Sequence, residues 1–268
     1  MASLLAACAA PSAKVLSAGS TAACVLDASP ELIPVPEPIA GELNVLFELP
    51  DSPEWWAPAP MDSERTQYRA ALVGRLGGED ALQPRALLQR QRAVHASLPG
   101  DRAREAENID ALLQGRAGTI SPASCLEWRL FQHQAHRFPA IDRPTEFGAY
   151  VLRGQGRIRV YFSGADRVGQ KLRHEVSDRV VADVARGFTP LAHLHNHPFL
   201  FDRKPGDRTW ATADTLADIA GALAPSLTDV QAYRQMREGF GLQGAWVTNG
   251  LDSAHYSAED LDRLSAWP

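Results

Sequence analysis

Three of the chain's eight histidines alternate within HLHNHP, residues 193–198. Residues two apart on a β-strand project to the same face, so His195 and His197 are placed to chelate one metal ion. His193 has the same parity but lies farther from His197, so we expect it only to line such a site. The alternative is a structural cluster, which would require buried hydrogen-bond partners for all three rings. The spacing favours one edge of a metal site.

A second motif, SLTD at residues 226–229, supplies a candidate third ligand. Ser226 and Asp229 have the spacing of a helix capping box, and capping alone would account for them. A carboxylate in the first turn also faces whatever lies beyond the helix N-terminus, so Asp229 is placed to complete a three-ligand zinc site with an open fourth position. Asp214 and Asp218, in the 28 residues (198–225) between the two motifs, are competing candidates.

A third element is Glu146, at the start of the apolar segment EFGAYVLRG. A carboxylate beside a metal can act as a general base, taking a proton from water and delivering it to a leaving amine. An exposed carboxylate at a strand end is the alternative interpretation. Glu127 is the nearest other carboxylate for the same role.

These three elements, in this order, resemble the signature of the JAB/MPN metalloprotease family, also called JAMM. Its upstream Glu matches Glu146, its His-x-His-Pro matches residues 195–198, and its Ser-x-x-Asp matches residues 226–229. The resemblance covers roughly residues 120–268 and implies a cytidine-deaminase-like domain, with a mixed sheet flanked by helices. Family members usually place the last two motifs within about ten residues of each other, so residues 199–225 would be an insertion beside the metal, a length that loop-closure entropy tolerates.

The resemblance also implies roles for the residues. His195, His197 and Asp229 would bind Zn²⁺, Glu146 would be the catalytic base, and Ser226 would donate a hydrogen bond to the developing oxyanion. The implied function is hydrolysis of a peptide or isopeptide bond in a protein or peptide substrate, such as a ubiquitin-like protein, as in bacterial deubiquitinase-like members. A catalytically inactive MPN-like scaffold or binding module remains the alternative.

The elements that must position these residues follow from periodicity and turn signals. We expect helices over 63–76, 84–98, 102–114, 124–138, 174–187 and 226–238, and strands over 146–154, 157–164, 189–196 and 241–250. This pattern predicts an α/β (α+β) domain over residues 120–268. A helical region over 61–119 precedes it, and residues 1–60 read as a leader and proline-rich linker. We expect Trp55 and Trp56 to dock this arm onto the domain behind it.

Composition argues against some function classes. The chain has 268 residues, 45% hydrophobic and 22% charged, with a formal net charge of −5, which gives no electrostatic footprint for nucleic acid. The letters His-Asn-His at 195–197 are not the HNH nuclease motif, whose residues are spread over a hairpin and helix. No apolar run reaches about 18 residues, so no transmembrane helix is expected.

The N-terminal segment leaves the location open. Residues 5–8, LAAC, resemble a lipoprotein attachment box ending at Cys8, but only seven residues precede that cysteine and none is charged. An exported lipoprotein and a cytoplasmic protein both fit. Cys24 and Cys125 could pair in an oxidising compartment, and three unrelated thiols fit equally well. The substrate and the oligomeric state do not follow from the sequence.

Overall fold

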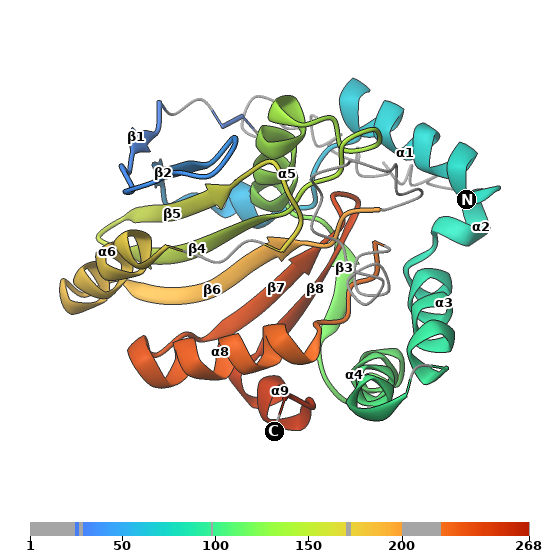
Figure 1. Cartoon of the computed structure of the whole chain (residues 1–268). Coiled ribbons are helices and arrows are strands. Elements are labelled where there is room, and N and C mark those ends of the chain that lie inside the picture. Colours follow the sequence, from blue (N-terminus) through green and yellow to red (C-terminus); the bar gives the residue numbers. More distant parts are fainter. Residues whose placement is uncertain (1–24, 27–28, 98, 170–172, 200–220, 268) are drawn as a thin grey trace, which may run out of the picture.

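A mixed eight-stranded sheet forms the centre of the molecule (Figure 1). The computed structural model describes residues 25–26, 29–97, 99–169, 173–199 and 221–267. The strand order is β1-β2-β5-β4-β6-β7-β8-β3, and every adjacent pair is antiparallel except β6 and β7. The strands are β1 (Glu31–Leu32), β2 (Leu43–Pro50), β3 (Thr119–Pro122), β4 (Phe147–Gly154), β5 (Arg157–Gly164), β6 (Thr189–Asn196), β7 (Gly244–Thr248) and β8 (Asp252–Ser257). The predicted α/β (α+β) class with a mixed, helix-flanked sheet is thereby confirmed.

Helices cover both faces of this sheet. Helix α5 packs on one face, and α6 and α8 pack on the other (Figure 1). The helices are α1 (Ser63–Leu76), α2 (Glu79–Leu82), α3 (Pro84–Ala96), α4 (Ala103–Leu113), α5 (Cys125–Arg137), α6 (His174–Ala185), α8 (Leu227–Phe240) and α9 (Ala258–Arg263), with short 3₁₀ turns η2 (Pro53–Trp56) and η3 (Gly100–Arg102). All six predicted helices are present, with ends shifted by a few residues.

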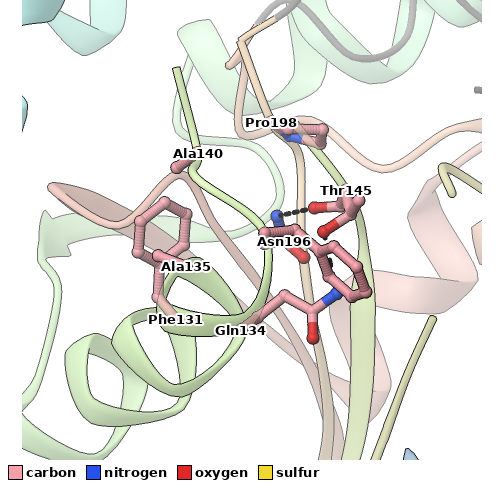
Figure 2. A pocket seen from close by; sticks show the side chains of 8 residues that line it. Phe131, Gln134, Ala135, Ala140, Thr145, Asn196 and Pro198 are labelled. Carbon is pink, nitrogen blue, oxygen red and sulfur yellow. Dashed lines mark hydrogen bonds between the residues drawn. The ribbon is translucent and has the colours of Figure 1, made fainter. Parts of the chain in front are cut away.

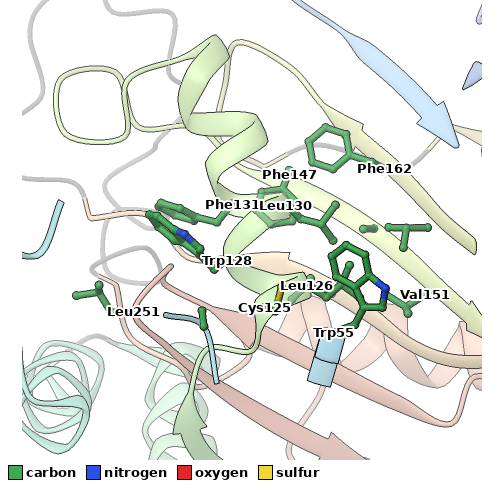
Figure 3. Close-up of a cluster of buried hydrophobic side chains, with 14 of the residues drawn as sticks. Trp55, Cys125, Leu126, Trp128, Leu130, Phe131, Phe147, Val151, Phe162 and Leu251 are labelled. Atoms are coloured by element: carbon green, nitrogen blue, oxygen red, sulfur yellow. The ribbon is translucent and has the colours of Figure 1, made fainter. Parts of the chain in front are cut away.

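Helix α5 anchors the larger core. Its side chains Trp128, Leu130 and Phe131 are buried against Phe147 and Phe162 of the sheet (Figure 3). The helix begins at a capping box in which Ser124 and Glu127 satisfy each other's backbone N–H groups. The apolar face of this helix therefore packs against the sheet, where it covers alternate residues of β4 and β6.

The β4–β5 hairpin forms as the sequence predicts. Its two-residue turn is Gln155-Gly156, with φ values of 53° and 72°. Two positive φ angles in succession define a type I′ turn, whose twist matches that of the flanking strands. The hairpin places the start of β4, and Glu146 just before it, at the same end of the sheet as the end of β6.

Part of the expected linker belongs to the sheet. Leu43–Pro50 forms β2, which pairs with β5 along its whole length. The prolines that indicated an extended arm lie upstream of this strand, and LNVLFELP itself is apolar enough to be buried between two neighbours. Trp55 follows in η2 and is 5% exposed, in agreement with the expected docking of the arm.

The structure also bears on the expected absence of a transmembrane helix and on the cysteines. Among the described residues, no helix combines the length and apolarity needed to cross a bilayer. Cys125, at the first residue of α5, is buried and disulfide-bonded, whereas Cys8 and Cys24 lie outside the described residues.

Candidate metal centre

His195 and His197 direct their ring nitrogens at each other, from the end of β6. Their Nε2 atoms are 2.9 Å apart. β6 is parallel to β7 here, and the backbone N–H of His197 continues the pairing by donating to Thr248 O at 2.9 Å. The strand geometry thus brings together the two histidines that the alternation had predicted.

Asp229 completes the cluster from the first turn of α8. Its Oδ2 lies 3.6 Å from His195 Nε2 and 3.6 Å from His197 Nε2. Ligand atoms about 2.0–2.1 Å from a tetrahedral zinc lie about 3.3 Å apart. The three observed separations, 2.9, 3.6 and 3.6 Å, are close to the edges of one face of such a tetrahedron. The donor set of two imidazoles and one carboxylate therefore fits zinc in composition and spacing.

The outer ring nitrogens of both histidines are hydrogen-bonded. His197 Nδ1 is 2.8 Å from Ala222 O, and His195 Nδ1 is 2.7 Å from the Tyr233 hydroxyl. A carbonyl only accepts, so neutral His197 carries its proton on Nδ1 and presents a lone pair at Nε2. The Tyr233 hydroxyl can accept from His195 in the same way. Such outer hydrogen bonds orient metal-ligating histidines and set their tautomer.

The electrostatics keep Asp229 ionised. Burial by itself would raise the pKa of this carboxyl, but its interactions with His195 and His197 outweigh burial and hold the pKa well below its usual range. The same Oδ2 accepts hydrogen bonds from Ser226 N and Ser226 Oγ, both at 2.8 Å, while Asp229 N donates back to Ser226 Oγ at 3.1 Å. Asp229 therefore caps α8 and faces the two histidines with the same carboxylate oxygen.

His193 lines the site without joining the cluster. Its ring lies 5.2 Å from Tyr150, 5.6 Å from Tyr233 and 6.0 Å from His195, between centroids. Burial, assisted by His195, lowers the pKa of His193 to about 3, so the ring is neutral. Neither ring nitrogen has a hydrogen-bond partner among the described residues. This matches the lining position expected for it.

Glu146 lies at the same end of the sheet, immediately before β4. The β4–β6 register ends at the pair Gly148–His195, so Glu146 on one strand and His197 on the other each lie two residues beyond the last pair. The Glu146 carboxylate accepts from Gly169 N at 2.5 Å, and its backbone N–H donates to Arg167 O at 3.0 Å. Burial raises the pKa of Tyr233 well above its usual value, and the negative charges of Asp229 and Glu146 contribute to the shift. Glu146 therefore lies at the same end of the sheet as the cluster but is not one of its three members.

Other candidates occupy different places. Glu127 is fully buried in the α5 capping box, where it accepts from Ser124 N at 2.6 Å and lies 2.7 Å from His255 Nε2 on β8. The Glu127 carboxylate is therefore bound to Ser124 and His255, and it is not placed as a base beside the three metal ligands. Asp214 and Asp218 lie outside the described residues.

The sequence reasoning missed two residues that support the ligands. Tyr233 stands four residues after Asp229, one helical turn along the same face of α8, and that spacing was a usable signal. Glu105 of α4 was not identifiable, because it comes from a helical region to which no role had been assigned. Its two carboxylate oxygens each accept from Leu227 N at 3.0 Å, which adds a cap to the helix that carries Asp229.

No protein-family model, curated protein or solved structure matches this chain.

Proposed function

We propose that this protein is a zinc-dependent metallopeptidase or isopeptidase of the JAB/MPN type. One observation carries the proposal: His195 Nε2, His197 Nε2 and Asp229 Oδ2 converge from two elements at distances that suit one tetrahedral zinc. The hydrogen-bonded outer nitrogens of the histidines, and the mixed sheet at one end of which the two histidines lie, add support.

The proposed division of roles follows from position. Zinc, when bound, polarises a carbonyl and lowers the pKa of a water to about 7. Glu146, just before β4 at the same end of the sheet, would accept the proton as water adds to the carbonyl carbon, and it would deliver that proton to the amine as the C–N bond breaks. Ser226 lies next to Asp229, with its hydroxyl available to stabilise negative charge on the carbonyl oxygen once it turns from the capping contact.

The substrate class in this proposal is a protein or peptide, including conjugates of ubiquitin-like proteins. Hydrolysis of an amide needs a general base, a Lewis acid and an oxyanion donor, and this end of the sheet offers a candidate for each. A quenched fluorescent peptide library and isopeptide-linked ubiquitin dimers, compared with and without zinc, identify the bond that is cleaved.

Metal stoichiometry is the first test. Purified protein loaded with zinc and freed of excess should contain about one zinc per chain, because three protein ligands at one centre hold the ion tightly. His195→Ala and His197→Ala should each abolish stoichiometric binding, as measured by elemental analysis. The matched control is His136→Ala on α5, whose ring bonds Glu64 at 2.8 Å instead. A folded wild-type protein that stays metal-free after zinc loading would refute the proposed metallopeptidase function. The catalytically inactive scaffold or binding module would then remain.

A further inference from the structure

Asn196, the residue between the two histidine ligands, faces the opposite side of the sheet. Alternation along β6 turns its side chain toward α5, where it is 1% exposed. Figure 2 shows the Asn196 amide beside Thr145 and Gln134. Burial of a primary amide is costly unless its donors and acceptor are satisfied, so its partners are informative.

Those partners flank Glu146 on both sides. Asn196 Oδ1 accepts from Phe147 N at 2.7 Å, and Asn196 Nδ2 donates to Thr145 O at 3.1 Å. The Asn196 side chain thus hydrogen-bonds the residue before Glu146 and the residue after it. Gln134 of α5 adds a second contact, since its Nε2 donates to Thr145 Oγ1 at 2.8 Å and to Glu146 O at 3.4 Å.

The end of the β4–β6 pairing explains why a side chain, and not a strand backbone, hydrogen-bonds the residues around Glu146. The β4–β6 ladder ends at the pair Gly148–His195, and beyond it His197 N bonds Thr248 O of β7. β6 therefore stays with β7 at its end, and Phe147, the first residue of β4, has no counterpart in the β4–β6 ladder. The Asn196 amide bridges this gap with one acceptor and one donor, as a strand backbone would.

We propose that Asn196 is a positioning residue that holds Glu146 at a fixed distance from the metal ligands. Its backbone is continuous with His195 and His197, and its amide binds the peptide units on either side of Glu146, so base and ligands move together. This inference rests on the proposed function, in which Glu146 is the base. A misplacement of about 1 Å in a reacting group can cost about 100-fold in rate, which makes such a link valuable.

Visible absorption of the Co²⁺-loaded protein tests the idea without a substrate, because Co²⁺ bands respond to the metal's ligands and to the groups that surround them. Glu146→Gln should change the band pattern while Co²⁺ stays bound. Asn196→Ala should produce a similar change, with Co²⁺ affinity within about tenfold of wild type, because Asn196 hydrogen-bonds none of the three ligands. Asn44→Ala is the control: Asn44 is equally buried, on β2, and contacts Glu42 and Ser163. Its spectrum should match that of wild type.

A second variant covers the case in which Asn196→Ala does not fold. Gln134→Met keeps the volume of the side chain but removes the donor to Thr145 and Glu146, and it should shift the bands in the same direction by a smaller amount. A wild-type spectrum in the folded Asn196 and Gln134 variants, alongside an altered Glu146→Gln spectrum, overturns the positioning role and leaves the proposed function standing. Wild-type protein that binds no Co²⁺, or a Glu146→Gln spectrum unchanged from wild type, overturns the metal centre or the base, and this inference with it.

Discussion

Asp229 shows how one carboxylate serves a helix and a metal site together. Its Oδ2 accepts both capping hydrogen bonds from Ser226 and faces both histidine Nε2 atoms. The capping interpretation and the ligand interpretation of the Ser-x-x-Asp motif are therefore compatible in space. They differ in the predicted effect of removing the negative charge of Asp229. Capping alone predicts a small loss of stability, whereas metal ligation predicts a large loss of zinc affinity.

Asp229→Asn separates the two contributions. The amide oxygen can still accept from Ser226 N, so the free energy of unfolding should fall by at most about 1 kcal/mol. Zinc affinity should fall by orders of magnitude, because an anionic oxygen is lost from the ligand set. Competition with a chromophoric chelator measures the affinity. Asp260→Asn is a close control, since Asp260 forms the same capping box with Ser257 at the start of α9. Normal zinc affinity in Asp229→Asn, with loss in Asp214→Asn or Asp218→Asn, would assign the third ligand to residues 198–225 instead.

Glu146→Gln tests the base at the same scale. The change keeps the side chain's size and leaves the three ligands untouched, so zinc content should equal that of wild type. Hydrolysis should slow by roughly 10²- to 10⁴-fold, as is typical when a general base is removed. Steady-state rates on a substrate identified by the peptide and ubiquitin-dimer screen provide the measurement. Glu127→Gln, which alters the α5 capping box, should affect stability but not the chemical step; the reverse outcome would move the catalytic role to Glu127.

At the scale of elements, two helices far apart in the sequence cooperate at the metal centre. Helix α4 supplies Glu105, whose buried carboxylate accepts from Leu227 N in the first turn of α8. A negative charge there also suits the positive end of the α8 dipole. The N-terminal helices thus help to hold the helix that carries Asp229 and Tyr233.

Glu105→Ala should therefore act at a distance on the site. Losing a charged cap from a buried N–H should lower the free energy of unfolding by about 1–3 kcal/mol. Zinc affinity should weaken as well, because the first turn of α8 is less firmly placed. Chemical denaturation and chelator competition report the two effects. Glu107→Ala, an exposed glutamate on the same helix that bonds Ser265 Oγ, should leave both nearly unchanged. Equal effects of the two substitutions would argue against a specific role for Glu105.

At the scale of the whole molecule, a partly buried ion pair joins two segments that are 131 residues apart in the chain. Glu42, just before β2, accepts from Arg173 Nε at 2.8 Å and Nη2 at 2.7 Å, just before α6. The Glu42 side chain is only 1% exposed. The hydrogen bond with Arg173 outweighs burial and, with further donors, lowers the pKa of Glu42 from 4.5 to about 2.

This pair should make stability depend on pH in a defined window. A carboxyl with a depressed folded-state pKa contributes fully above its unfolded-state pKa, and the contribution disappears as pH falls from about 4.5 to about 2. Glu42→Gln should lower stability at pH 7 and reduce the loss of stability over that window, measured by urea unfolding at several pH values. Glu31→Gln, which removes an exposed ion pair with Arg179, is the matched control, and its stability at pH 7 should be close to that of wild type.

Local patterns determined much of this protein. Alternation in HLHNHP placed His195 and His197 on one face, and the Ser226–Asp229 spacing placed a carboxylate in the first turn of α8. Gln155-Gly156 closed the β4–β5 hairpin. Each of these depends on periodicity or turn chemistry within a few residues, which the sequence states directly.

Only the tertiary structure decided how these local pieces meet. The approach of Asp229 to the histidines depends on the β6–α8–β7 crossover, and the cap from Glu105 joins residues 122 apart in the chain. Leu43–Pro50 becomes a strand because it pairs with β5 along its full length. Asn196 hydrogen-bonds both neighbours of Glu146 because the backbone pairing between β4 and β6 ends at that point. Long-range contacts of this kind depend on the packing of distant segments, and a single sequence does not encode that packing in any local period.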